Sequence, residues 1–196
     1  DEMDIAFEFD LALSFVNAAY GPIVASLNQQ AQKVLESYPA GQYGTFLTNH
    51  DQNRVRAVLP SDEKAKLAAS MLLTFPGVPF IYYGEEIGML GSKPDEDIRL
   101  PMQWTGDAPG AGVTNGTPWR SPDQDDTTRN VTTAITEPTS LWNHYRELIA
   151  LRNQYPALRT GEAVLVEADT ARLYAMLRYS ESEAFLVLVN PYPRDL

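Results

Sequence analysis

The stretch Thr45-Phe-Leu-Thr-Asn-His-Asp-Gln-Asn-Arg54 joins a short apolar run to a group of polar side chains. Asn49, His50 and Asp51 stand side by side, and Arg54 follows three residues later. Polar side chains at the point where a strand gives way to a loop are typical of α/β enzymes, which place their chemistry at the carboxyl ends of strands. The alternative is that Asn49, His50 and Asp51 only turn the loop, because Asn and Asp favour turns.

The sequence around this stretch alternates the patterns of strands and helices. Apolar residues at every second position are typical of strands, and apolar residues at steps of three and four are typical of one helix face. These patterns predict strands over 5–9, 43–47 and 78–83, and helices over 23–38 and 61–75, the second of them deeply buried. The uninterrupted apolar run at 78–83 favours a strand covered on both faces. The alternating order predicts a parallel sheet with right-handed crossovers.

The second half of the chain changes character twice. Residues 88–138 are rich in Gly, Pro, Asp, Thr and Asn, which predicts a long structureless loop, and such loops are usually functional. Ser140 is expected to cap a helix that ends near Tyr155-Pro156. Beyond Gly161, short apolar runs follow without a helix between them, which favours antiparallel pairing in a separate β unit. These runs lie at 163–166, 172–179 and 184–189.

The composition narrows the classes of partner. The chain carries 15 Lys and Arg against 26 Asp and Glu, for a net charge of −11. This excess of acidic residues argues against nucleic acid or an anionic membrane as a partner, because both are polyanions. No apolar run reaches the ~18 residues that span a bilayer. The lack of cysteine excludes disulfides, thiolate zinc sites and cysteine nucleophiles, and it leaves the compartment open.

The acidic run at 123–126 suggests a calcium site at first sight. It lacks the glycine and the terminal glutamate of an EF-hand loop, so a solvated turn is the favoured interpretation. The sequence therefore predicts no metal site and no cofactor.

Two motifs resemble those of a known family. The segment Phe46-Leu-Thr-Asn-His-Asp51 resembles the strand-7 motif of the α-amylase superfamily of glycoside hydrolases, and Gly77-Val-Pro-Phe-Ile-Tyr-Tyr-Gly-Glu-Glu-Ile-Gly-Met89 resembles its strand-8 motif. The segments 99–104 and 117–119 are similar to the part after strand 8 in the oligo-1,6-glucosidase, maltodextrin glucosidase and amylase-like branch, and Ile5-Ala-Phe-Glu-Phe9 fits strand 6. By this resemblance, the sequence is identified as a C-terminal fragment of a family 13 glycoside hydrolase, from about barrel strand 6 onward.

The resemblance implies a fold and a division into domains. It implies an α/β fold, the C-terminal part of a (β/α)8 TIM barrel about three βα units long, followed by the start of an antiparallel β domain. The barrel part is expected over 1–160 and the partial β domain over 161–196. Three βα units leave two sheet edges uncovered, so the fragment is expected to self-associate through these edges.

The resemblance also implies roles for individual residues. The family uses an aspartate nucleophile after strand 4, a glutamic acid after strand 5 and a second aspartate after strand 7, which corresponds to Asp51. The Asp51 carboxylate would hold sugar hydroxyls and favour the oxocarbenium-like transition state of retaining hydrolysis. His50 would donate to the same sugar, with Asn49 beside it. Arg99 would close the pocket around the non-reducing end, and Arg54 would orient a loop carboxylate or a neighbouring sugar.

Alternatives remain for the arginines and the tryptophans. Arg54 and Arg99 form ordinary surface ion pairs in the alternative interpretation. Trp104 and Trp119 either stack on sugar faces or pack inside the long loop, and packing is the favoured interpretation.

The family's strand-4 and strand-5 motifs have no match in these 196 residues. We therefore expect that a parent protein hydrolyses or transfers α-glucosidic bonds of starch-like oligosaccharides, whereas this piece supplies Asp51 but lacks the nucleophile and the general acid and is inactive alone. The alternative is a non-catalytic carbohydrate-binding or scaffolding member of the same fold. Calcium binding in an upstream part, the preferred linkage and the compartment stay open.

Overall fold

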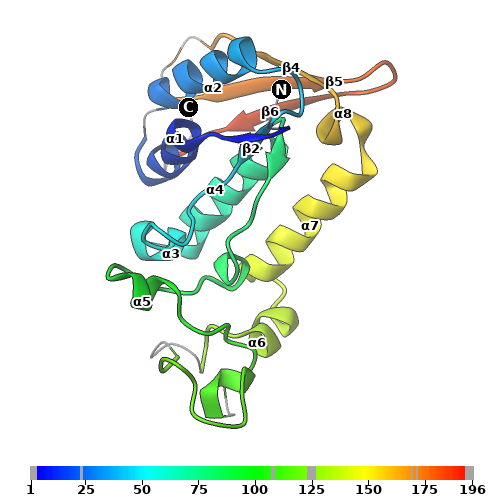
Figure 1. The fold of residues 1–196 in the computed structure, drawn as a ribbon. Coiled ribbons are helices and arrows are strands. Elements are labelled where there is room, and N and C mark those ends of the chain that lie inside the picture. Colours follow the sequence, from blue (N-terminus) through cyan, green and yellow to red (C-terminus); the bar gives the residue numbers. More distant parts are fainter. Residues whose placement is uncertain are drawn as a thin grey trace. The chain divides into compact units, whose positions relative to one another are not determined.

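The chain forms two compact units, and Figure 1 shows their helices and strands. The structure is a computed structural model that describes residues 4–22, 24–106, 109–122, 127–168, 170 and 172–192. The first unit, called the sheet unit, comprises residues 1–47, 67–80 and 148–196. The second, called the loop unit, comprises residues 48–66 and 81–147.

The sheet unit contains a parallel sheet of three short strands. They are β1 (Ala6–Phe7), β2 (Tyr43–Thr45) and β3 (Val78–Pro79), in the order β1-β2-β3. Helices α1 (Phe9–Tyr20) and α2 (Ala25–Ser37) connect β1 to β2, and α4 (Asp62–Thr74) lies between β2 and β3 in the chain. Parallel pairing requires such crossovers. The predicted strand–helix–strand–helix–strand order is therefore confirmed.

Aromatic rings cover one face of this sheet. Tyr43 on β2 is buried between Tyr38 and Phe75, with ring centroids 5.7 and 6.5 Å away. Gly77, just before β3, has a φ of 98°, and a Cβ at this position would come within 2.5 Å of the Tyr43 ring. Glycine alone tolerates both the left-handed conformation and the close approach. The Pro76-Gly77 break thus lets β3 reach its place beside β2.

The first helix, α1, is not among the helices that the sequence predicts. The strand expected over 5–9 ends at Phe7, and α1 begins at Phe9. Leu11, Phe15 and Ala19 follow at helical spacing and are fully buried. A helix buries this stripe against α2 and β2. A strand would instead place the buried Ala12 and Val16 on the face opposite to the stripe, because successive side chains of a strand alternate between faces.

The strand predicted over 78–83 is wrong in both length and burial. β3 ends at Pro79, and only the Phe80 amide makes one further bond, 2.7 Å to the Thr45 carbonyl oxygen. The Phe7 and Phe80 rings meet with their centroids 4.7 Å apart, and both rings are exposed. Apolar side chains of this run can pack against other rings from a loop, as Phe80 does against Phe7. An apolar run therefore does not require strand pairing along its whole length.

The three C-terminal strands form the predicted antiparallel sheet. They are β4 (Glu162–Leu165), β5 (Tyr174–Tyr179) and β6 (Ala184–Val189), in the order β4-β5-β6. Helix α8 (Pro156–Arg159), which the sequence does not predict, starts with a proline and contacts β5 and β6. The domain boundary between residues 160 and 161 stays a prediction.

Serine side chains cap the N-termini of two long helices, α4 and α7 (Leu141–Gln154). Ser61 Oγ accepts a hydrogen bond from the Lys64 amide (3.3 Å) at the start of α4. Ser140 Oγ accepts one from the Asn143 amide (3.1 Å) at the start of α7. Both helices are confirmed, with caps of the expected kind.

The loop unit is not structureless, so that prediction for residues 88–138 is wrong. Asn130 Oδ1 caps a helix by accepting from the Thr133 amide (2.8 Å). A small apolar core forms around Ile87, Met89 and Leu100. The sequence analysis overlooks both signals because they are short and local. The short helices are α3 (Val55–Val58), η1 (Glu85–Ile87), α5 (Asp95–Ile98), η2 (Pro109–Gly112) and α6 (Val131–Thr136).

Some further expectations concern single segments. Trp104 and Trp119 are both exposed, so the favoured interpretation that they pack inside the loop is wrong. The acidic run at 123–126 and Ile23 lie outside the described residues.

Among the helices of the described part, none combines the length and the hydropathy needed to cross a bilayer.

Candidate functional site

Four of the five residues predicted for the site form one contact group in the loop unit. Arg99 Nη2 donates to Asp51 Oδ1 at 2.9 Å, and Arg99 Nε donates to the His50 carbonyl oxygen at 2.9 Å. His50 Nε2 lies 3.4 Å from Asp51 Oδ2. Asn49 Oδ1 accepts from the Asp51 amide at 2.9 Å, which turns the loop beneath the carboxylate. Asn49 therefore acts as a turn residue, and His50 and Asp51 gain a partner 48 to 49 positions along the chain.

This contact group is open to solvent. The side chains of His50 and Asp51 are 65% and 61% exposed, and that of Arg99 is 39% exposed. An ionised carboxylate offers two oxygens with room for further hydrogen bonds, and guanidinium groups donate from several N–H groups. The site can therefore bind a ligand rich in hydroxyl groups without first breaking a buried contact.

Asp95, at the start of α5, supplies a second carboxylate to Arg99. Arg99 Nη2 donates to Asp95 Oδ2 at 2.8 Å. Hydrogen bonding from Lys93, together with the charge of Arg99, lowers the pKa of the Asp95 carboxyl from its usual value. Arg99 thus donates to two carboxylates, those of Asp51 and Asp95. The sequence analysis does not predict Asp95, although its position four residues before Arg99 on a helical segment is a recognisable signal.

Arg54 lies deeper than the other predicted residues. Its side chain is buried, and Nη1 donates to the Tyr83 carbonyl oxygen at 2.7 Å. The guanidinium carbon lies 4.6 Å from the ring centroids of both Tyr82 and Tyr83. The alternative of a surface ion pair is therefore wrong for Arg54. For Arg99, the ion-pair contacts exist, and they join it to the predicted carboxylate.

Tyr82 and Tyr83 are the residues of this region that the sequence analysis misses, because it assigns them to a strand. Tyr82 donates its hydroxyl to the Ile98 carbonyl oxygen at 3.0 Å. Tyr83 donates its hydroxyl to the Leu100 carbonyl oxygen at 2.7 Å. Burial raises the pKa of the Tyr82 hydroxyl to about 12, and the charge of Tyr83 adds to this effect. The sequence signal that could have identified them is a pair of adjacent tyrosines, each with a polar hydroxyl, at the end of an apolar run.

Comparison with known proteins bears on this geometry. The family model of the α-amylase catalytic domain matches residues 2–161. The chain belongs to the α-amylase family. It is 40% identical over 148 residues to alpha-amylase 3 of Dictyoglomus thermophilum, a match that covers 74% of this chain and 29% of that protein. It is 32% identical over 192 residues to an oligo-1,6-glucosidase of Heyndrickxia coagulans, covering 76% and 34%.

The solved structures agree with this family. The crystal structure of the alpha-amylase from H. orenii is similar with a TM-score of 0.86 and 37% identity, and the match covers 97% of this chain and 40% of that chain. The fold class is therefore confirmed as part of an α-amylase barrel followed by an antiparallel sheet. The chain spans about a third of the length of the curated relatives named here.

Two adjacent carboxylates, the buried Glu85 and the half-buried Glu86, lie elsewhere in the loop unit. Tyr145 donates its hydroxyl to Glu85 Oε1 at 2.5 Å, while Glu85 Oε2 has no hydrogen-bond partner among the described residues. Burial raises the pKa of the Glu85 carboxyl to about 8, and the charge of Glu86 adds to the rise. Burial also raises the pKa of Glu86. A protonated Glu85 is the form that this apolar environment favours.

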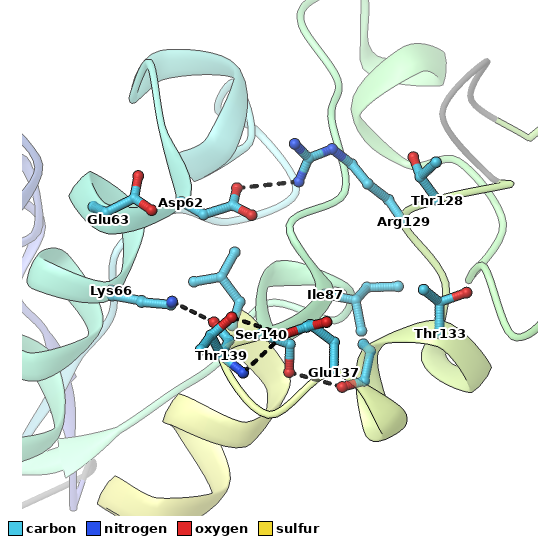
Figure 2. Close-up of a pocket in the computed structure, with 12 residues that line it drawn as sticks. Asp62, Glu63, Lys66, Ile87, Thr128, Arg129, Thr133, Glu137, Thr139 and Ser140 are labelled. Carbon is cyan, nitrogen blue, oxygen red and sulfur yellow. Dashed lines mark hydrogen bonds and ion pairs between the residues drawn. The ribbon is translucent and has the colours of Figure 1, made fainter.

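A polar cavity of ≈ 640 Å³ also lies in the loop unit, and Figure 2 shows its lining. Arg129 Nη1 reaches Asp62 Oδ1 at 3.2 Å across one side, and Lys66 donates to the Thr139 carbonyl oxygen on another. None of the five predicted residues is among those that line it. Because the residues that resemble the family's motifs lie outside this cavity, we look for the chemistry of the α-amylase family at Asp51 and Arg99.

The described residues also bear on metal binding. They contain no group of three or more His, Cys, Asp or Glu side chains arranged to hold a metal ion. Asp51 instead accepts a hydrogen bond from the Arg99 guanidinium, and its carboxylate lies 3.4 Å from the His50 imidazole.

Proposed function

We propose that the complete protein containing this sequence cleaves or transfers α-glucosidic bonds of starch-like oligosaccharides by a retaining mechanism. The observation that carries the proposal is the Asp51–Arg99 contact, because it joins the segment that resembles the family's strand-7 motif to the segment that resembles the part after strand 8. The relatives named alpha-amylase and oligo-1,6-glucosidase support the same class of substrate.

Asp51 is proposed to bind two hydroxyls of the sugar at the cleavage point. Its carboxylate opposes the positive charge that develops as the glycosidic bond breaks, and fixed charges of this kind act most strongly in the transition state. His50 donates to the same sugar, and Arg99 orients the carboxylate while it limits the pocket at the non-reducing end. Arg54 is proposed to act from beneath, through the loop that carries Asp51.

The nucleophile and the general acid are proposed to come from other parts of the complete protein. No segment of the 196 residues matches the family's strand-4 or strand-5 motif. Retaining hydrolysis requires two carboxyl groups about 5 to 5.5 Å apart. These residues alone are therefore expected to bind a sugar weakly and to turn over no substrate. We also propose that the barrel part extends over 1–160 and a β domain begins at 161, which the end of the family match at residue 161 supports.

Kinetics of the complete protein on maltooligosaccharides and isomaltooligosaccharides tests this function. The first product should carry the α-anomeric configuration by NMR, because a retaining enzyme keeps it. The isolated 196-residue chain, assayed under the same conditions, should show no turnover. A complete protein that binds these sugars without cleaving them would establish the non-catalytic alternative instead.

The isolated chain is also proposed to self-associate through its parallel sheet. Strands β1 and β3 pair on one side only within the described sheet, and the exposed rings of Phe7 and Phe80 lie on its face. Unpaired edges and exposed apolar rings favour association. Light scattering should report a species larger than 21.8 kDa, and a monodisperse monomer would contradict the proposal.

A further inference from the structure

Arg99 is bracketed by hydrogen bonds to the carbonyl groups on both sides of it. The Tyr82 hydroxyl donates to the carbonyl of Ile98, and the Tyr83 hydroxyl donates to the carbonyl of Leu100, at 3.0 and 2.7 Å. We propose that Tyr82 and Tyr83 are positioning residues that hold Arg99 in place against Asp51. This inference rests on the proposed function, because it concerns how the same site is kept ready for substrate.

The need for such support follows from where Arg99 lies. It is the residue after the last turn of α5, a helix of only four residues, and its φ and ψ of −114° and 29° are not helical. A short helix gives little rigidity to the residue that follows it. The Arg99 side chain must nevertheless reach the His50 carbonyl, Asp51 and Asp95 at the same time. Anchors on both neighbouring carbonyls supply the missing rigidity.

The tyrosine rings are themselves held in place. Their centroids lie 4.8 Å apart in an edge-to-face arrangement, and the buried guanidinium of Arg54 lies 4.6 Å from each. Arg54 also donates from its side chain to the Tyr83 carbonyl (2.7 Å) and from its amide to the Gly91 carbonyl (2.9 Å).

Arg54 stands three positions after Asp51, so a closed loop of contacts runs through both partners of the site. It passes from Asp51 along the chain to Arg54, then through Tyr83 and the Leu100 carbonyl to Arg99, and from Arg99 back to Asp51.

A purely structural role is the competing explanation. The two hydroxyls also satisfy carbonyl groups beside the buried side chains of Ile98 and Leu100, and this alone stabilises the fold. The explanations differ in one respect. If the hydroxyls act through Arg99, their effect on catalysis must disappear when Arg99 is removed, whereas a general loss of stability would not depend on Arg99.

A double-mutant cycle in the complete enzyme tests the proposal. Tyr82→Phe/Tyr83→Phe keeps both rings and removes both hydroxyls. We expect it to lower kcat/KM by about tenfold when Arg99 is present, since misplacement by about 1 Å can cost up to about 100-fold. In the Arg99→Ala background, the same pair of changes should lower kcat/KM by less than about twofold. Equal losses in both backgrounds would overturn the positioning role.

A second readout does not depend on activity. Hydrogen exchange at Arg99 Nε, followed by nitrogen-15 NMR, reports the bond to the His50 carbonyl. We expect exchange to be at least about tenfold faster in Tyr82→Phe/Tyr83→Phe, as a lost anchor permits local opening. Unchanged exchange would overturn the proposal. If exchange responds but Arg99→Ala leaves kcat/KM unchanged, the positioning of Arg99 is supported and the function proposed for Arg99 fails.

Tyr145→Phe provides the matched control. It removes a buried tyrosine hydroxyl of the same unit, one that donates to the Glu85 carboxyl and not to a carbonyl beside Arg99. Exchange at Arg99 Nε should stay as in the unchanged enzyme, and any change in kcat/KM should be the same with and without Arg99. If exchange at Arg99 Nε is as fast in Tyr145→Phe as in Tyr82→Phe/Tyr83→Phe, the cause is a general loss of rigidity in the loop unit. That result would contradict the proposal.

Discussion

Two buried arginines of the sheet unit and the partly exposed Arg99 of the loop unit make different kinds of contact. In the sheet unit, Arg152 and Arg178 are buried, and all their described hydrogen bonds go to backbone carbonyls. Arg152 Nη1, for example, donates to the carbonyls of Leu73 and Phe75 at 2.8 and 2.7 Å. In the loop unit, Arg99 is partly exposed and donates to two carboxylates.

The difference separates arginines that hold the fold from arginines that can serve a ligand. Burial lowers the pKa of Arg178 to about 10, with repulsion from Arg152 adding to the shift, so the charge in the sheet unit is costly. It persists because it satisfies several carbonyls that would otherwise lack partners. The side chain of Arg99 is partly exposed, and that of its carboxylate partner Asp51 is open to solvent. The proposed role of Arg99 therefore rests on its contact with Asp51 at an exposed position.

Arg178→Met should have the largest effect on stability. The change leaves the carbonyls of Thr74 and Gly161 without their donor in a buried place. We expect a loss of roughly 3 to 5 kcal/mol in the free energy of unfolding, measured by urea denaturation. Arg159→Met in the same unit changes an exposed arginine and should cost less than about 0.5 kcal/mol. If Arg178→Met and the unchanged protein are equally stable, Arg178 does not hold the fold and the distinction between the buried arginines and Arg99 is wrong.

Glu85→Gln extends the comparison by removing a buried carboxyl group that can titrate from the loop unit. The pKa of Glu85 is raised in the folded state to about 8 from 4.5, so the stability gained from its bound proton is complete below pH 4.5 and is lost as the pH rises through about 8. Relative to Glu85→Gln, the unchanged protein should therefore lose about 1.4 kcal/mol per pH unit across this window. Urea denaturation at pH 5 to 8 measures it. Parallel stability curves would show that the carboxyl does not titrate as stated.

Arg99→Lys should affect activity more than stability. Lysine keeps the charge but cannot donate to two carboxylates and a carbonyl from one planar group. In the complete enzyme, kcat/KM should fall about tenfold, or about 1.4 kcal/mol, while the melting temperature changes little. Arg159→Lys serves as the control, with no change expected in either quantity. A large loss of stability in Arg99→Lys would place Arg99 with the structural arginines.

The sequence predicts most of the fold where local signals are strong. The helix after Ser140 and the three antiparallel strands follow from a cap and from spacing alone, and the structure confirms them. Prediction fails at 78–83, because an apolar run does not distinguish a paired strand from tyrosines whose partners lie 16 and 17 residues away. Such partners depend on the tertiary fold, which no local pattern contains.

The candidate site shows the same limit. The resemblance singles out Asp51 and Arg99, and the structure brings them together across 48 positions. It places Arg54 in the interior, which no pattern of the sequence indicates, because arginine is usually exposed. The roles of Asn49, His50, Asp51, Arg54 and Arg99 toward a sugar stay predictions.

Asp51→Asn in the complete enzyme tests the central claim most directly. The amide keeps the size of the side chain and removes the charge that faces Arg99 and, in the proposed function, the sugar. We expect kcat/KM to fall by about 10²- to 10³-fold, or roughly 2.7 to 4 kcal/mol, with an unchanged melting temperature. Asp10→Asn, at an exposed position of the sheet unit, should leave both unchanged. Undiminished turnover by Asp51→Asn would contradict the account.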